Sequence, residues 1–245
     1  MQSPFTHQKP AHASNGFTLI ELLVVILIIA ALAAITFTAL ARIKKSANQA
    51  ITTGNMRQIG VALASFSAEN NRFPSQIGDP VWDRAIMTQL GQVVVPTGNG
   101  SIKRSAFPAL QGLASIFTTP EDKEKRDPSV YQRSFAIVPW TTNWSNGTAF
   151  RGWKDRPFSK GIPNSALIAP EKAAMVVQWY SGDSGIANLL GHGNHAYHDM
   201  GGPPKALGPQ QQVLFADGHI EKIPANITNA EFVKRYWPGS MGNIN

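Results

Sequence analysis

The pattern of apolar and polar residues divides the chain near residue 41. Between Glu21 and Arg42 lies an uncharged run of twenty residues, LLVVILIIAALAAITFTALA. A helix of this length, at about 1.5 Å per residue, spans the roughly 30 Å hydrocarbon core of a bilayer. Because lipid offers no hydrogen-bond partner to an irregular backbone, the run predicts a transmembrane helix over residues 17–41.

The same helix is predicted to continue through residues 42–70 as an amphipathic segment. Apolar or small residues recur near the helical period at Ala47, Ala50, Ile51, Gly54, Ile59, Ala62, Leu63 and Phe66. Asn70, Asn71 and then Pro74 predict its end, since proline disfavours a helical conformation in the residue before it. Only this second half has a polar face, so only this half needs a folded domain packed against its other side.

The sequence of residues 71–245 predicts a folded head. Its first part predicts two further helices. Asp79-Pro80 has the sequence of an N-cap followed by a first helical residue. A short helix is therefore expected to follow, to run to Leu90 and to end at Gly91. A second helix is expected near residues 106–116.

The rest of the head contains strand patterns. Residues 131–138 alternate in part, and residues 173–179 are rich in β-branched and aromatic side chains. Residues 212–216 and 219–223 are two further strand-like runs. They flank Asp217-Gly218, a dipeptide typical of a two-residue hairpin turn that requires a positive φ at both positions.

After the hairpin, Thr228 and Glu231 have the spacing of a capping box, which predicts a helix that Pro238-Gly239 would end. Residues 140–158 hold three tryptophans among Asn, Gly and Arg and predict a surface loop. Together the patterns predict an α+β fold, in which the amphipathic helix lies across a small antiparallel sheet.

Composition narrows the class of protein. The 245 residues include 21 Gly and 17 Pro with only 15% charged residues, which favours a loop-rich head over a helical bundle. The chain has no cysteine, so disulfides and thiolate metal sites are excluded. Its net charge of +7 comes from scattered basic residues, so we expect a solvated surface and no nucleic-acid partner.

Glu21 stands at the edge of the apolar run, where an ionisable group is costly and indicates a functional partner. The string GFTLIELLVV, residues 16–25, resembles the prepilin signature of type IV pilins and type II secretion pseudopilins. The resemblance implies that prepilin peptidase cuts between Gly16 and Phe17 and methylates the new amine of Phe17. It also implies that Glu21, fifth in the mature chain, faces the terminal amine of a neighbouring subunit. A buried carboxylate and a buried ammonium are each costly alone and tolerable together.

The resemblance implies a structural subunit with a pilin-like fold, and not an enzyme. Residues 1–16 would be a leader, residues 17–41 an assembly helix and residues 71–245 a periplasmic or extracellular head. The protein would sit in a bacterial inner membrane by a single pass. The implied partners are prepilin peptidase, other pilin or pseudopilin subunits, and the assembly platform with its ATPase.

Other interpretations of the N-terminal segment remain open. A secretory signal cut near residues 30–33 would need a shorter apolar core behind a basic segment, whereas only Lys9 precedes this run. A simple membrane anchor without an assembly role is harder to exclude than a secretory signal. Arg42, Lys44 and Lys45 follow the run, so the positive-inside rule would place the C-terminal side in the cytoplasm. The leader signature favours the opposite orientation.

A histidine-rich segment is the candidate metal site. Its potential ligands are His192, His195, His198, Asp199 and Asp217. The glycine-rich setting favours a polar loop with solvated or hydrogen-bonded histidines, so we expect no cofactor. If a metal binds through Asp183, Asp199 or Asp217, calcium suits the oxygen ligands, and some pseudopilins carry calcium in a C-terminal loop.

The same region carries a second resemblance. His198 and the segment from Leu214 to His219 resemble the two ends of the H-X9-DG segment of a large prepilin-like group. That segment has nine residues between His and Asp-Gly, whereas eighteen separate His198 from Asp217 here. The extra residues lie at about 203–211, and neither end is assigned a catalytic task.

Two alternative functions use the same anchor. The head would act as a ligand-binding module that forms no bulk filament, through the histidine loop or the tryptophan-rich segment. The second alternative is a membrane-anchored hydrolase that uses a metal at the histidine cluster. The chain has no Gly-x-Ser-x-Gly nucleophile motif.

Overall fold

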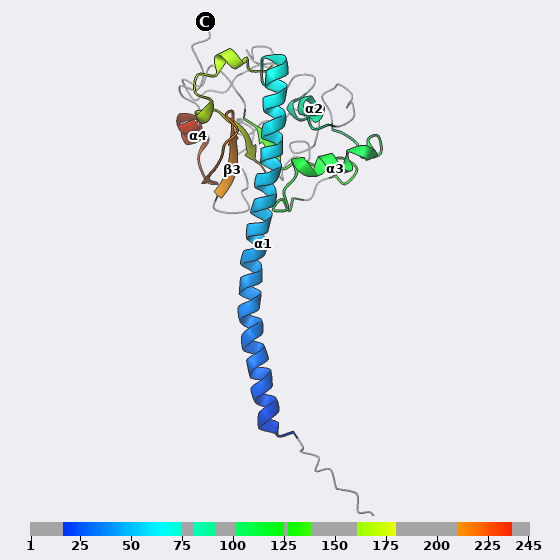
Figure 1. Ribbon diagram of the computed structural model, residues 1–245, viewed down its shortest axis with the longest axis vertical. Coiled ribbons are helices and arrows are strands. Elements are labelled where there is room, and N and C mark those ends of the chain that lie inside the picture. The colour runs from blue at the N-terminus through cyan, green and yellow to red at the C-terminus, as the bar shows by residue number, and fades with distance from the viewer. Residues whose placement is uncertain are drawn as a thin grey trace, which may run out of the picture. The chain divides into compact units, whose positions relative to one another are not determined.

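The computed structural model describes residues 17–74, 81–91, 101–124, 127–138, 161–179 and 210–236. It divides the chain into two compact units, residues 1–46 and residues 47–245. One helix, α1 (Leu19–Asn70), contributes to both units (Figure 1). The long helix predicted to end at Asn70 is confirmed.

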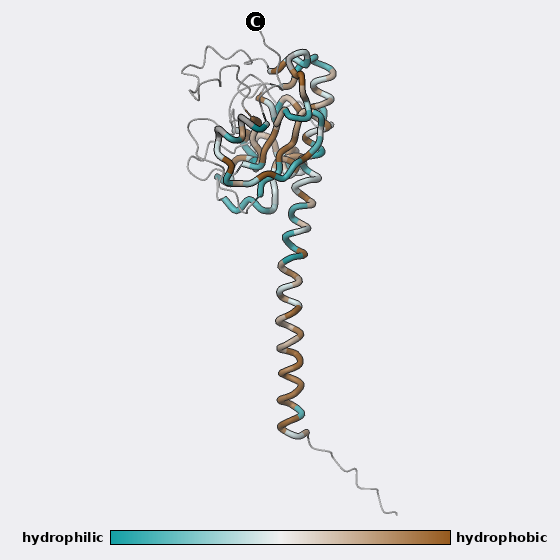
Figure 2. Tube along the Cα trace, turned by 90° about the vertical axis from the view of Figure 1, so that its left-hand side faces the viewer, coloured by the Kyte–Doolittle hydropathy of each residue, from teal (hydrophilic) through white to brown (hydrophobic). Residues whose placement is uncertain are grey.

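In the first unit the structure describes residues 17–46, nearly all of which belong to the N-terminal part of α1. In this part every side chain is exposed apart from that of the half-buried Ala33. The tube in Figure 2 shows hydrophobic residues along most of this part, and mixed colours after it. Among the described residues, α1 is the one helix long and apolar enough to cross a membrane.

The second unit begins with residues 47–70 of α1, which pack against the head. The buried positions of α1 are Thr52, Met56, Ile59, Ala62, Leu63 and Ser67. The predicted apolar stripe is therefore correct for Ile59, Ala62 and Leu63 and wrong for Ala47, Ala50 and Ile51, which are exposed. The polar Thr52 takes their place, because its hydroxyl lies 2.5 Å from that of the buried Thr119.

Four antiparallel strands form one sheet in the order β1-β2-β3-β4. Their bounds are Phe135–Ile137 for β1, Ala174–Gln178 for β2, Gln210–Phe215 for β3 and Ile220–Pro224 for β4. All five residues of β2 are buried. The sheet and α1 confirm the predicted α+β, pilin-like fold class.

The sheet is covered by a helix on each face. On one face, α1 approaches β3 so closely that a Cβ on Gly60 would lie 3.1 Å from Leu214 Cδ1. On the other face, Phe215 packs edge-on against Tyr236 of α4 (Asn229–Tyr236), with 5.6 Å between ring centroids. Neighbouring strand residues point to opposite faces of a sheet, so Leu214 faces α1 and Phe215 faces α4.

The remaining described helices are short. They are α2 (Trp82–Met87), η1 (Pro108–Leu110), α3 (Gln111–Ala114), η2 (Ser115–Phe117), η3 (Asn164–Ala166) and η4 (Pro170–Lys172). The helix predicted near residues 106–116 is confirmed as the series η1, α3 and η2. The helix predicted after Asp79-Pro80 starts later than expected, at Trp82, with Val81 as its N-cap. Asp79-Pro80 lies outside the described residues, and Gly91 ends the following turn at a φ of 77°.

The strand predicted at residues 131–138 is wrong in its first half, because β1 covers only residues 135–137. The backbone N–H of Ser134 donates to Phe117 O at 2.8 Å, which ties this part of the chain to η2. Arg133 is fully buried, and its Nη1 lies 2.5 Å from Asp83 Oδ2 of α2, which is also fully buried. This ion pair joins α2 to the segment that enters β1.

The hairpin is confirmed and its predicted turn is wrong. Among the described non-glycine residues only Asn71 has a positive φ, so Asp217 does not adopt the conformation that a two-residue turn requires. Gly218 N donates to Phe215 O, Phe215 N donates to His219 O, and Gly218 has a φ of 91°. These contacts make a three-residue loop whose last residue is a left-handed glycine. Asp217 Oδ1 supports the loop by accepting from His219 N at 3.1 Å.

Candidate functional site at the start of the long helix

The first residues of α1 form a reciprocal capping box. The backbone N–H and the hydroxyl of Thr18 both donate to Glu21 Oε2, at 2.8 and 2.7 Å. In return, Glu21 N donates to Thr18 Oγ1 at 3.3 Å. Thr18 O accepts the first helical bond, from Leu22 N. The helix begins here because the sequence Thr-x-x-Glu satisfies donors that would otherwise have no partner within the helix.

This arrangement gives Glu21 a local role that the sequence analysis did not assign. Its carboxylate sits in the first turn of α1, where the helix dipole favours negative charge. Thr18 is the residue that the sequence analysis missed. The signal that identifies Thr18 is its spacing of three residues from Glu21, the same spacing that predicts the box at Thr228.

The capping box uses one oxygen of the Glu21 carboxylate, so the other oxygen can accept further hydrogen bonds. A carboxylate accepts about four hydrogen bonds through its two oxygens. Within the described residues, all the hydrogen bonds to the Glu21 side chain go to Oε2. Phe17 precedes the box with 77% of its surface exposed. The site can therefore accept a cation at Oε1 while Thr18 holds Oε2, and Gly16 lies outside the described residues.

Most of the candidate metal ligands lie outside the described residues, namely Asp183, His192, His195, His198 and Asp199. Asp217 is described, and its Oδ1 lies 2.6 Å from His219 Nδ1. The ring of His219 stacks on Phe215 at 4.3 Å between centroids. Across the described ranges, no group of three or more His, Cys, Asp or Glu residues gathers. The structure thus gives Asp217 a place in the hairpin turn.

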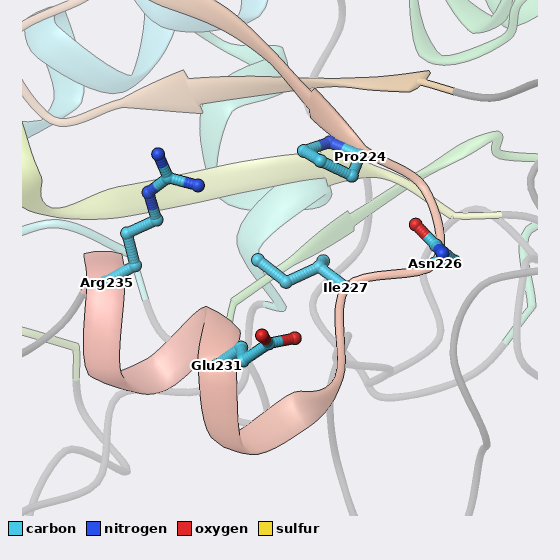
Figure 3. Close-up of a pocket in the computed structure, with 5 residues that line it drawn as sticks. All are labelled: Pro224, Asn226, Ile227, Glu231 and Arg235. Atoms are coloured by element: carbon cyan, nitrogen blue, oxygen red, sulfur yellow. The ribbon is translucent and has the colours of Figure 1, made fainter.

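A hollow of about 670 Å³ lies beside α4, lined by Pro224, Asn226, Ile227, Glu231 and Arg235 (Figure 3). The Glu231 carboxylate serves the second capping box, because it accepts from Thr228 Oγ1 at 3.2 Å. This box confirms the predicted start of α4.

Burial and the nearby Glu221 carboxylate raise the pKa of Tyr236, at the end of α4.

Comparison with known proteins adds one match. Residues 12–37 match a family described as the prokaryotic N-terminal methylation motif. No curated protein and no solved structure matches the chain. The match supports a prepilin-like protein that is processed by a prepilin peptidase and anchored in a membrane. It indicates a structural, pilin-like protein, and it implies assembly with pilin subunits.

Proposed function

We propose that the protein is a structural subunit of a type IV pilus or of a type II secretion pseudopilus. The observation that carries the proposal is the combination of a methylation motif with an exposed apolar helix that has Glu21 in its first turn. Residues 1–16 are then the leader, and residues 17–41 are the transmembrane and assembly helix. Residues 42–70 continue this helix, and residues 71–245 complete the head.

Processing creates the partner that Glu21 needs. Hydrolysis of the Gly16–Phe17 peptide bond frees the amine of Phe17, which prepilin peptidase then methylates. A secondary methylammonium keeps its positive charge and two N–H donors. The new charge lies one residue before the capping box, at the same end of α1 as Glu21.

Assembly follows from the cost of charge in lipid. An isolated carboxylate at membrane depth costs a few kcal/mol, and a buried ammonium has a similar cost. The attraction between Glu21 of one subunit and the Phe17 amine of a neighbour offsets part of both costs, so it favours the oligomer over the monomer. The capping box supports this pairing because it orients the carboxylate before the neighbour arrives.

The head is proposed to face the periplasm, and the exterior after assembly. Prepilin processing places the leader on the cytoplasmic side, which overrides the positive-inside preference of Arg42, Lys44 and Lys45. The further partners are the assembly platform and its ATPase. The sequence around residues 16–25 supports these partners through its resemblance to pilins and pseudopilins.

Mass spectrometry of the protein from its native membrane tests the processing step. We expect a mature N-terminus at Phe17 that carries one additional methyl group. A chain that retains residues 1–16 in the native membrane would refute the proposal, and so would a terminus near residue 34. The first result would leave a simple anchor, and the second would indicate a secretory signal.

A further inference from the structure

A narrow group of cations lies where the apolar run of α1 ends. Arg42, Lys44 and Lys45 occur within four residues, and each side chain is exposed. Among the described residues, none of the three forms an ion pair or a side-chain hydrogen bond. The chain also has no acidic residue between Glu21 and Glu69. Neighbouring turns of α1 therefore offer these cations no intrachain counter-charge.

The geometry of the group limits the kind of anionic partner that fits it. Successive helix residues are turned by about 100°, so Arg42 and Lys45 lie about 60° apart and Lys44 lies about 100° from Lys45, which spreads the three cations over about 160° of the helix surface. Along the axis they are confined to about 4.5 Å. Cations that spread around the helix at one depth match a plane of charge, which is the geometry of a headgroup layer.

The depth of the group agrees with such a plane. Twenty uncharged residues separate Glu21 from Arg42, a length of about 30 Å at 1.5 Å per residue. The hydrocarbon core of a bilayer is about 30 Å thick. With Glu21 at one boundary of the core, the three cations reach the headgroups of the other. This step rests on the membrane insertion that the proposed function requires.

We propose that Arg42, Lys44 and Lys45 form a basic patch that binds the headgroups of anionic phospholipids beside α1. The patch would fix the depth of the helix and collect anionic lipid at the side of the membrane that carries the head. A basic residue near an anionic surface contributes enough to enrich a contacting anionic lipid about fivefold over a neutral one. The effect is electrostatic, so it must weaken as the Debye length falls to about 3 Å in 1 M salt.

The test uses the full-length protein reconstituted in phosphatidylcholine vesicles that contain a minor fraction of phosphatidylglycerol. Electron paramagnetic resonance of spin-labelled phosphatidylglycerol and phosphatidylcholine reports which lipid is immobilised at the protein surface. We expect a severalfold preference for phosphatidylglycerol at low salt and little preference in 1 M NaCl. The triple variant R42Q/K44Q/K45Q should bind both lipids equally. Glutamine preserves helix propensity at these exposed positions, so the variant should fold normally.

Arg57→Gln is the matched control, because Arg57 is exposed on the same helix about 18 Å beyond Lys45. It should keep the full preference of the wild type. Equal binding of both lipids by the wild type, or an unchanged preference in the triple variant, would overturn the inference. Loss of the preference in the control alone would move the site to another part of α1 and would also overturn it. Failure of the wild type to insert into neutral vesicles would instead refute the membrane anchor on which the proposed function depends.

Discussion

The buried ion pair between Asp83 and Arg133 makes the sharpest stability prediction. Both side chains are fully buried, and the Arg133 guanidinium also lies 5.3 Å from the ring centroid of Trp82. Arg133→Met removes the positive charge and retains much of the aliphatic volume. The Asp83 carboxylate then stays in a buried site without the guanidinium that balances its charge.

The expected loss is large for a single substitution. Breaking a buried pair by removing one partner costs about 3–5 kcal/mol. A desolvated cation–π contact contributes up to about 2 kcal/mol, some of which is already counted in that figure. We therefore expect about 4 kcal/mol of destabilisation. With a urea dependence of about 2 kcal/mol per molar, the unfolding midpoint should fall by about 2 M.

The assay is urea unfolding of the full-length protein in detergent, followed by tryptophan fluorescence. Arg57→Met is the control, because it makes the same chemical change at an exposed position and should shift stability by less than about 0.5 kcal/mol. Asp83→Asn and the double variant complete a double-mutant cycle. The double variant should lose at least about 2 kcal/mol less than the sum of the single variants. A loss near that of the control, or additive losses, would refute the reasoning.

Four further predictions concern assembly and the head. Glu21→Ala should abolish incorporation into filaments while membrane insertion, measured by carbonate extraction, stays intact; normal filaments would contradict the pairing. Thr18→Ala should lower filament yield less severely, since removing a cap costs about 1 kcal/mol, and Thr18→Ser should restore the yield. Gly60→Val should lower the thermal midpoint because a Cβ there meets a β3 side chain at 3.1 Å, whereas Gly54→Val has open space and should cost less. The raised pKa of Tyr236 means that the fold favours the neutral phenol. The contribution of Tyr236 to the free energy of unfolding is therefore complete below pH about 10 and is lost as pH rises through the pKa of the folded state. The pH dependence of unfolding should therefore be flatter for Tyr236→Phe above pH 10, and an equal decline in both proteins would contradict the shift.

The features that the sequence predicted well depend on local patterns. The end of α1 at Asn70 follows from neighbouring polar residues and a proline, and the box at Thr228 from a spacing of three residues. The position of the hairpin also follows from neighbouring residues. The length of its loop does not, because the pairing of Leu214 with Ile220 sets how many residues remain to close the loop. The Asp-Gly signal is compatible with both the two-residue and the three-residue loop.

The features that the sequence could not predict depend on distant partners. Arg133 interrupts a strand pattern for a reason that lies fifty residues earlier in the chain, at Asp83. Thr52 is buried on α1 because Thr119 meets it from a loop. An apolar stripe read from α1 alone selected exposed residues such as Ile51, since periodicity does not show where the head begins. Pairing partners at these separations are set by the folded chain and not by any local pattern.

The capping box also changes how the acid in the apolar run is understood. An acid at membrane depth was expected to need a partner from another chain, which makes the monomer costly. The structure instead gives Glu21 two donors from Thr18 in its own chain. The free-energy gain on assembly is therefore smaller than that for an unsatisfied carboxylate, although the neutral donors of Thr18 leave the negative charge of Glu21 uncompensated. Such a monomer is tolerated in the bilayer before assembly, while the uncompensated charges at the helix start still favour association with a neighbour.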